Sequence, residues 1–212
     1  MGSLTWFTTT RYDIAYEVNR LAQKLSEPTK GAMACVHRVM AYLKHTWDKC
    51  LAVPRVRGDT WSFYSDSDHA GDSKSGDVRS TTGVIILLNG MPIFWRSNKQ
   101  PKTSLSSACA EIYALSEACK DAKLRICVHR DLGRHVEYPI KIQVDNAAGV
   151  SFQHSTCASS KLRGIFDMAE KWVQELKNVK VVDAVKVDTT KNLADMLTKC
   201  LAFLLEILWK DS

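Results

Sequence analysis

Residues 60–71 read TWSFYSDSDHAG, and the rest of the chain can be organised around them. Trp61 and Phe63 alternate with polar residues, a pattern that is typical of a half-buried strand. The pattern runs directly into Asp66, after which the sequence becomes polar and glycine-bearing. We predict a strand over residues 60–66 that carries the Asp66 carboxylate at its last position, anchored in the sheet and in contact with water.

Length and composition indicate an ordinary globular protein. The chain has 212 residues, of which 45% are apolar and 25% charged, and this suits one large domain or one domain with an additional fragment. The sequence has no apolar run of the length that a membrane span needs and no signal-peptide pattern, so we expect an intracellular protein that is not secreted. The net charge of +6 allows a polyanionic partner without requiring one.

The seven cysteines favour a reducing compartment. Their number is odd, no two of them form a CxxC pair, and none follows a zinc-ligand spacing. We therefore interpret them as small apolar residues of a protein inside the cell.

Residues 1–55 carry helical patterns and no strand pattern. Apolar residues recur at helical spacing over residues 12–25 and again over residues 35–43, and Pro28 separates the two runs. Two short helices bury little surface on their own, so we expect this segment to pack on something else. The prediction is a helical segment in front of a main domain that covers residues 56–212.

From residue 56 onward, strand patterns and helix patterns follow one another. Asn89-Gly90 is a strong hairpin signal between two apolar runs, so we expect the first three strands to form an antiparallel meander. This order of elements predicts an α/β fold in which two further strands complete a five-stranded mixed sheet and helices pack on it. The predicted elements are strands at 60–66, 82–88 and 91–97, a helix from about 104 to 132, a strand at 140–145, a short helix from 146 to about 152, a helix at 161–177, a strand at 179–187 and a helix from 192 to about 208.

Four carboxylates occupy positions from which they could meet. Asp66 and Asp145 end predicted strands, Glu111 lies near the start of a helix, and Asp195 lies in the first turn of another. If the two strands are parallel neighbours, their ends are about 5 Å apart. Carboxylates this close repel one another unless a cation lies between them, and oxygen ligands alone favour Mg²⁺ or Mn²⁺. Two such ions about 4 Å apart are a known arrangement for phosphodiester hydrolysis.

Each of these acids also has a purely structural explanation. An Asp at the end of a strand is most often a turn residue, and Glu111 or Asp195 could complement a helix dipole. The carboxylates on their own therefore leave both interpretations open.

Six short motifs form a specific combination. The chain contains YSDSDHAGD at 64–72, RSTTG at 79–83, FWRSNKQ at 94–100, SSACAEIYAL at 106–115, VDNAAG at 144–149 and NLADMLTK at 192–199. Together they resemble the ribonuclease H domain of Ty1/copia-type retrotransposon Pol polyproteins, over about residues 56–201. The stretches RYDIAYEVNRL and RVMAYLKHT, within residues 11–53, resemble the tail that follows the reverse transcriptase palm in the same polyproteins.

The resemblance implies a ribonuclease H-like fold and an endonuclease that cuts the RNA strand of RNA–DNA hybrids with two Mg²⁺ ions, which Mn²⁺ could replace. It makes Asp66, Glu111, Asp145 and Asp195 the catalytic metal ligands. Asp66 and Asp145 would hold both ions or their bridging water, and the other two would each complete one ion's shell. Asp68 competes for the first position, but Asp66 fits the family better.

The resemblance also implies partners and a location. The partners are an RNA–DNA hybrid and the reverse transcriptase portion of the same polyprotein, without a membrane or a small-molecule cofactor. The expected location is a cytoplasmic particle or the nucleus.

Two departures from the family pattern support a second hypothesis. Cys109 stands where the family has an acid, and residues 160–167, SKLRGIFD, lack the histidine of the corresponding family segment. The alternative is a weak or inactive remnant of a retroelement that only binds nucleic acid or has a structural role.

Polar and basic residues near the predicted sheet edge are candidate contacts for a hybrid, which proteins read through its backbone and 2′-hydroxyls. For the charged members a solvated surface is an equally good explanation. The candidates are Arg79, Ser80, Thr81, Arg96, Asn98, Lys99, Gln100 and Lys102.

Overall fold

A computed structural model describes residues 1–55, 58–69, 78–154 and 168–200. Three antiparallel strands form a meander: β1 (Trp61–Asp68), β2 (Thr81–Leu88) and β3 (Met91–Lys99). The turn between β2 and β3 uses the predicted Asn89-Gly90 pair, and both residues have positive φ, 52° and 81°, as such a turn requires.

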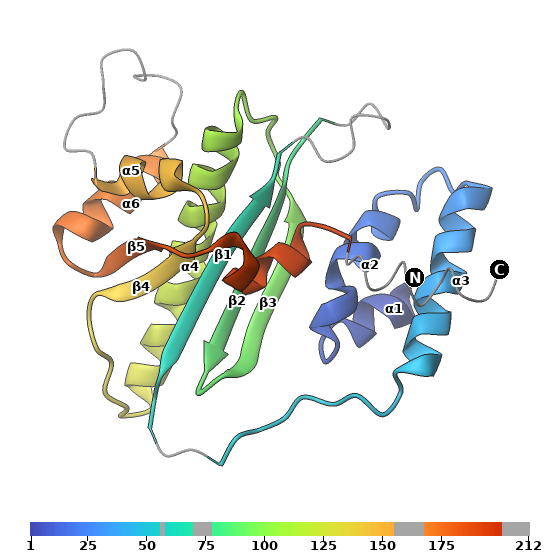
Figure 1. Cartoon of the computed structure of the whole chain (residues 1–212), viewed down its shortest axis with the longest axis horizontal. Helices are drawn as coiled ribbons and strands as arrows, with labels where there is room; N and C mark the ends of the chain where they lie inside the picture. Colours follow the sequence, from blue (N-terminus) through green and yellow to red (C-terminus); the bar gives the residue numbers. More distant parts are fainter. Residues whose placement is uncertain (56–57, 70–77, 155–167, 201–212) are drawn as a thin grey trace.

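Two parallel strands complete the sheet on the other side of β1. Strand β4 (Ile140–Val144) pairs with β1, and β5 (Val182–Lys186) pairs with β4, so the strand order is β3-β2-β1-β4-β5 (Figure 1). The predicted α/β arrangement, an antiparallel three-strand meander completed by two further strands into a five-stranded mixed sheet, is therefore confirmed. Its central strand β1 ends beside β4, and this places the carboxyl ends of two parallel strands together.

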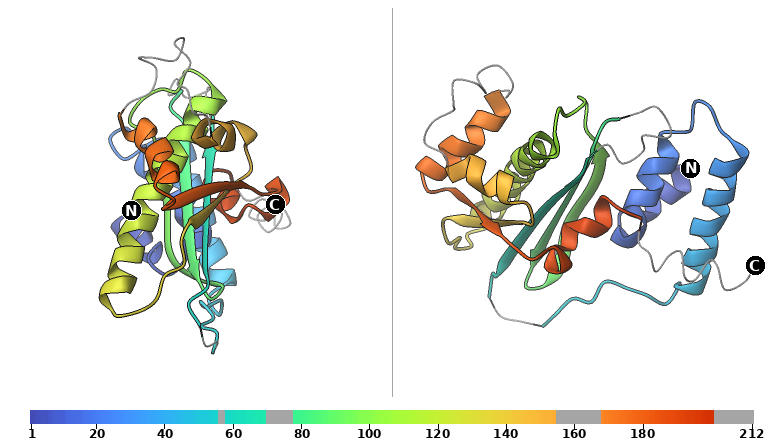
Figure 2. Two further views of the ribbon diagram at one scale, coloured as in Figure 1. Left: turned by 90° about the vertical axis from the view of Figure 1, so that its left-hand side faces the viewer. Right: turned by 45° about the horizontal axis from the view of Figure 1, so that its top comes forward.

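Three helices build the main core on one face of the sheet. The long helix α4 (Ser107–Asp131) runs along that face, with α6 (Met168–Asn178) beside it, and α5 (Ala147–His154) packs on both (Figures 1 and 2). Ser106 begins α4, because its side chain accepts a hydrogen bond from the backbone N–H of Cys109 at 3.2 Å. The core here is aliphatic and includes Val84, Ile86, Leu115 and Ile142, all nearly inaccessible to solvent.

The opposite face of β2 is covered by the last described segment of the chain. Ile85 and Leu87 alternate with the residues that face α4, and they pack on Ala194 and Leu197 of the 3₁₀ helix η5 (Leu193–Leu197). Another 3₁₀ turn, η4 (Thr189–Lys191), precedes it. Strand β2 is therefore buried on both faces, which explains why its sequence is a continuous apolar run.

The amino-terminal residues form a separate group of helices beside β3. They are α1 (Gly2–Phe7), the 3₁₀ turn η1 (Tyr12–Ile14), α2 (Ala15–Ala22) and α3 (Lys30–His45), and they share their own apolar cluster. Helix α3 packs on α2 and lies away from the sheet (Figure 1). No helix in the described ranges is long and apolar enough to cross a membrane.

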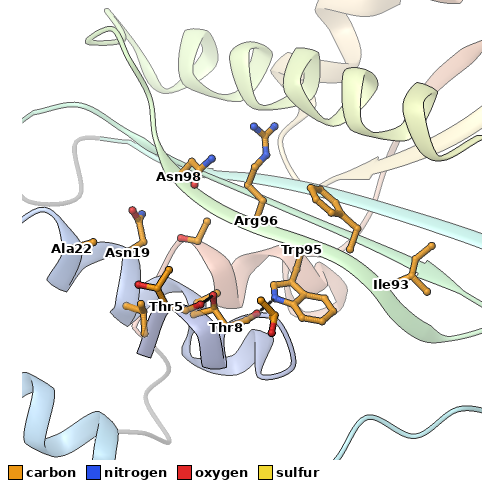
Figure 3. A pocket seen from close by; sticks show the side chains of 13 residues that line it. Thr5, Thr8, Asn19, Ala22, Ile93, Trp95, Arg96 and Asn98 are labelled. Carbon is orange, nitrogen blue, oxygen red and sulfur yellow. Dashed lines mark hydrogen bonds between the residues drawn. The ribbon is translucent and has the colours of Figure 1, made fainter. Parts of the chain in front are cut away.

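The helical segment contacts β3 through α2 and through the residues that follow α1. The Trp95 indole N–H donates a hydrogen bond to the Thr8 carbonyl oxygen at 2.6 Å, and the same ring packs edge-on against Tyr12 at 5.7 Å. A cavity of about 530 Å³ remains between these helices and β3; Figure 3 shows Thr5, Asn19 and Trp95 among the side chains around it. The boundary between segment 1–55 and domain 56–212 stays a prediction.

Several predicted element boundaries were wrong. Strand β1 continues two residues past Asp66, because Ser67 and Asp68 still pair with β2. The α-helix predicted from residue 192 is a 3₁₀ helix over Leu193–Leu197, since this short segment is shaped by its contacts with β2 and β1. The predicted helix at 161–177 begins at Met168 within the described part; residues 161–167, and the predicted helical residues after 200, lie outside the described residues.

Candidate metal centre

Three of the four predicted carboxylates converge. Asp66 lies in β1, Asp145 directly follows β4, and Glu111 lies in the second turn of α4. Each offers an oxygen atom, and the three atoms lie within 4.8 Å of one another. The parallel pairing of β1 with β4 brings Asp145 to Asp66, and the packing of α4 on β1 adds Glu111.

Burial and mutual repulsion raise the pKa of two members of this cluster. Asp66 is only 2% exposed; burial raises its pKa to about 6, and Asp145 and Asp195 act in the same direction against a hydrogen bond from Thr198. Glu111 is 8% exposed, and burial, followed by repulsion from Asp66 and Asp145, raises its pKa to about 8. The expected contact of Asp66 with water was therefore wrong, because η5 and α4 cover the end of β1.

Asp195 lies outside the 4.8 Å group but close enough to raise the pKa of Asp66. Its carboxylate accepts a hydrogen bond from the Lys199 ammonium group, four residues further along the chain. Partial burial alone would lower the pKa of Lys199, but the bond to Asp195 and the charges of Asp66 and Asp145 outweigh it, so the pKa lies above its ordinary value. The Lys199 side chain therefore places a positive charge beside the acidic cluster.

The donor set fits a hard divalent cation. The three clustered groups are all carboxylates, from a strand, a helix and a loop that follows a strand, and two of them are held in a buried environment that disfavours their negative charge. A cation between them would remove the repulsion that raises their pKa values, and oxygen donors of this kind suit Mg²⁺ or Mn²⁺. Asp68, the competitor of Asp66, is not part of the cluster, although burial raises its pKa as well.

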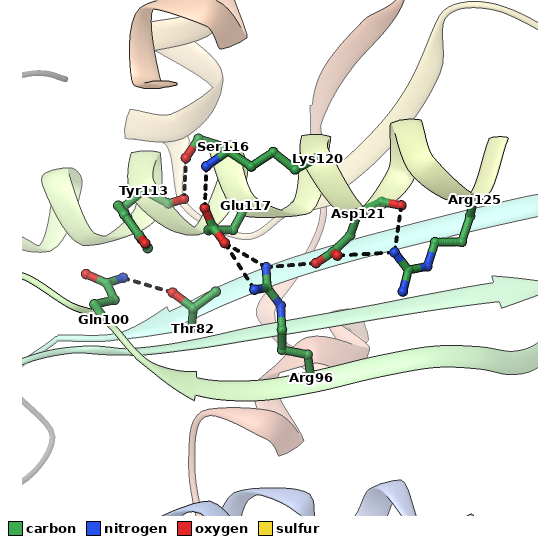
Figure 4. Close-up of polar contacts among 9 residues, drawn as sticks. All are labelled: Thr82, Arg96, Gln100, Tyr113, Ser116, Glu117, Lys120, Asp121 and Arg125. Atoms are coloured by element: carbon green, nitrogen blue, oxygen red, sulfur yellow. Dashed lines mark hydrogen bonds and ion pairs between the residues drawn. The ribbon is translucent and has the colours of Figure 1, made fainter. Parts of the chain in front are cut away.

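The predicted contacts for nucleic acid separate into buried and accessible residues. Ser80, Thr81 and Gln100 are buried, at 0%, 7% and 2% exposure, so their assignment to a binding surface was wrong. Gln100 instead donates a hydrogen bond to Thr82 Oγ1 at 3.0 Å (Figure 4). It also donates to the Ala110 carbonyl oxygen at 3.1 Å, which ties β2 to the start of α4. The remaining uncharged candidate, Asn98, is exposed.

Arg96 is also corrected, because its guanidinium group is engaged by α4. It contacts Glu117 at 3.0 Å and Asp121 at 2.7 Å, as Figure 4 shows, and all three side chains are largely shielded from solvent. Arg79 and Lys102 are exposed and Lys99 is half-buried. These three basic residues, with Asn98, remain predictions as contacts for a polyanion.

Two residues next to the cluster were missed as functional candidates. Thr198 is completely buried and its hydroxyl donates a hydrogen bond to Asp66 Oδ2, and Lys199 pairs with Asp195. Both belong to the quoted motif NLADMLTK, so the signal was present, but their contacts become visible only when η5 is seen against β1.

Comparison with known proteins finds relatives over nearly the whole chain among transposon Pol polyproteins. No family model matches the chain. The Retrovirus-related Pol polyprotein from transposon RE2 of Arabidopsis thaliana is 31% identical over 204 residues, which cover 95% of this chain and 14% of that protein. The chain is homologous to a segment of the Ty1/copia-type Pol polyproteins. It spans only about one seventh of the length of the first of these relatives.

Two further matches cover less of this chain, and one of them also has a lower sequence identity. Secreted RxLR effector protein 161 of Plasmopara viticola is 41% identical over 113 residues, which cover 53% of this chain and 78% of that protein. The solved structure of LC11-RNase H1, isolated from compost, superimposes with a TM-score of 0.48 and 18% identity, over 66% of this chain and 93% of that one.

Proposed function

We propose that this homologue of Ty1/copia-type Pol segments is a metal-dependent endonuclease of the ribonuclease H type, which cuts the RNA strand of RNA–DNA hybrids. The observation that carries the proposal is the convergence of Asp66, Glu111 and Asp145 within 4.8 Å, from three elements far apart in the sequence. A structural role for each acid alone would not require them to meet, and their meeting costs energy in the absence of a cation.

The chain's own residues would bind and orient the metal ions. Asp66, Glu111 and Asp145, with Asp195 nearby, would hold one or two Mg²⁺ ions, or Mn²⁺ in their place. When bound, such ions supply a more acidic attacking water and stabilise the negative charge that develops on the phosphodiester. Burial of Asp66 and Glu111 keeps competing water away from these ligands and fixes their side chains on a strand and a helix.

The hybrid would bind by its phosphates next to the acidic cluster. Arg79, Asn98, Lys99 and Lys102 are the accessible members of the predicted set, and a net charge of +6 is compatible with a polyanion. The helical segment 1–55 would join the domain to the reverse transcriptase portion of a longer polyprotein, in a cytoplasmic particle or the nucleus.

A second candidate function is supported by the pair Lys199–Asp195. Because Asp195 already has a cationic partner and lies outside the 4.8 Å group, the chain could retain the fold and bind nucleic acid without completing a second metal site. Cys109, in the first turn of α4, adds to this candidate, since it stands where the family has an acid.

Cleavage of a labelled RNA–DNA hybrid tests both candidates. Purified protein in Mg²⁺ or Mn²⁺ should shorten the RNA strand, and Asp145→Asn should abolish cleavage. Asp59→Asn is the matched control, because Asp59 lies before the start of β1, at the end of the strand remote from Asp66. Binding without cleavage by the wild-type protein would favour the second candidate. Cleavage that survives Asp145→Asn would refute the proposed site.

A further inference from the structure

Thr198 is not one of the candidate metal ligands, but it contacts one of them, Asp66. It lies at the end of η5 and is completely buried, and its hydroxyl donates a hydrogen bond to Oδ2 of Asp66, 132 positions earlier in the chain. The same oxygen atom of Thr198 lies 3.0 Å from the Asp195 carbonyl oxygen. Thr198 therefore connects the segment that carries Asp195 with the carboxylate of the central strand.

A glycine allows this contact to form. Gly83 of β2 is the cross-strand partner of Asp66, and η5 crosses directly over it. A Cβ atom at Gly83 would lie 2.8 Å from the Ala194 carbonyl oxygen, 2.8 Å from Cγ2 of Thr198 and 2.9 Å from Cβ of Leu197. A backbone oxygen cannot move aside as the end of a flexible side chain can, so any larger residue would push the segment away from β2.

The other end of the segment is fastened to the neighbouring residue of β1. Asn192 is 4% exposed, its side-chain amide donates to the Ser65 carbonyl oxygen at 3.1 Å, and its side-chain oxygen accepts from the backbone N–H of Ala194 at 3.2 Å. Asn192 and Thr198 therefore bind consecutive residues of β1, Ser65 and Asp66. Two attachment points fix the distance and orientation of Thr198 relative to the Asp66 carboxylate.

We propose that Thr198 is a positioning residue for the Asp66 carboxylate and that Gly83 provides the space for it; this inference rests on the proposed metal site. Among its carboxylate neighbours Asp66 meets only repulsion, which would turn its side chain away. A hydroxyl that holds Oδ2 fixes the rotation of the carboxylate and leaves the other oxygen to a cation. Hydrogen-bond partners of this kind typically change metal affinity by about 10–100-fold when they are removed.

Binding of Mn²⁺, measured by the loss of the free-ion signal in electron paramagnetic resonance and by calorimetry, tests this role without any substrate. The informative pair is Thr198→Ser and Thr198→Ala, which differ only in the hydroxyl. We expect Thr198→Ala to weaken binding at least about 10-fold and Thr198→Ser to stay close to the wild type. Gly83→Ala should behave like Thr198→Ala, because it moves the segment away from β2.

A matched control separates positioning from general loss of stability. Val173→Ala removes buried atoms from the core between α6 and the sheet, remote from the acidic cluster, and should lower the melting temperature without changing Mn²⁺ affinity. Equal affinities for Thr198→Ala, Thr198→Ser and the wild type would overturn the positioning role and leave the metal site intact. Absence of Mn²⁺ binding by the wild-type protein would refute the metal site itself, and the role of Thr198 with it.

Discussion

Replacing Glu111 by glutamine should stabilise the metal-free protein. The pKa of Glu111 is raised from 4.5 to about 8 by burial and by the charges of Asp66 and Asp145. Between these two values the folded state binds more protons than the unfolded state, so the free energy of unfolding falls as the pH rises through this window. Glutamine has the same shape and no charge, and it removes this cost.

The size of the effect follows from the two pKa values. At pH 7 the folded protein must keep Glu111 largely protonated while the unfolded chain ionises it, which costs about 3 kcal/mol. Relief of that cost should raise the melting temperature by about 6–12 °C, at about 2–4 °C per kcal/mol for a chain of this length. Below about pH 4 the two proteins should unfold alike, because Glu111 is then protonated in both states.

Glu117 provides a control on the same helix with the opposite sign. Burial alone would raise its pKa, but hydrogen bonds from Lys120 and Arg96 outweigh it and hold the pKa below its usual value. Glu117→Gln should therefore destabilise the protein, by about 1–2 kcal/mol, because it removes charge-assisted hydrogen bonds.

The assay is thermal unfolding followed by circular dichroism in a chelating buffer, from acid to mildly alkaline pH. A Glu111→Gln protein that melts at or below the wild-type temperature at neutral pH would refute the reasoning, since it would mean that the Glu111 charge is not buried against its neighbours. The same substitution should weaken Mn²⁺ binding, so the variant gains stability and loses the site.

Three other predictions follow from the same geometry. Mg²⁺ should raise the melting temperature of the wild-type protein more at about pH 8 than at about pH 5.5, because binding requires the ionised carboxylates; equal increments in a thermal-shift assay would contradict this. Lys199→Met should tighten Mn²⁺ binding about 3–10-fold by calorimetry, since it removes the positive charge that pairs with Asp195, and unchanged or weaker binding would show that Lys199 does not compete with the ion. Gln100→Leu should lower the free energy of unfolding in urea by about 2 kcal/mol, because it leaves Thr82 and the Ala110 carbonyl without their donor; a loss of hybrid binding at unchanged stability would instead restore Gln100 as a surface contact.

Local sequence patterns predicted most of the sheet. The alternation through Trp61 and Phe63 and the turn signal at Asn89-Gly90 depend on neighbours within a few residues, and both predictions hold in the structure. The position of Asp145 directly after β4 was predictable for the same reason. Its proximity to Asp66 depends on which strands pair, and that was only a conditional expectation from the sequence.

Predictions that depend on tertiary packing were less accurate. Gln100 is a polar residue among basic ones, which favours a surface position, yet it is 2% exposed because both ends of its amide find partners inside the protein. In α4, Leu124 and Val128 are apolar but 59% and 53% exposed, because the buried face at that end of the helix runs through Ala122, Ile126 and His129 instead. The role of Thr198 required knowledge of where η5 crosses β2.

The attachment of residues 192–198 to β1 has a consequence for biosynthesis. A ribosome adds Thr198 more than a hundred residues after Asp66, so the acidic cluster stays incomplete while that stretch is translated. A shortened product that stops after β5 would contain the residues of all five strands but lack Thr198, whose hydroxyl donates a hydrogen bond to Asp66. Premature termination between β5 and Thr198 would thus leave Asp66 without its hydrogen bond and would also uncover Ile85 and Leu87 of β2.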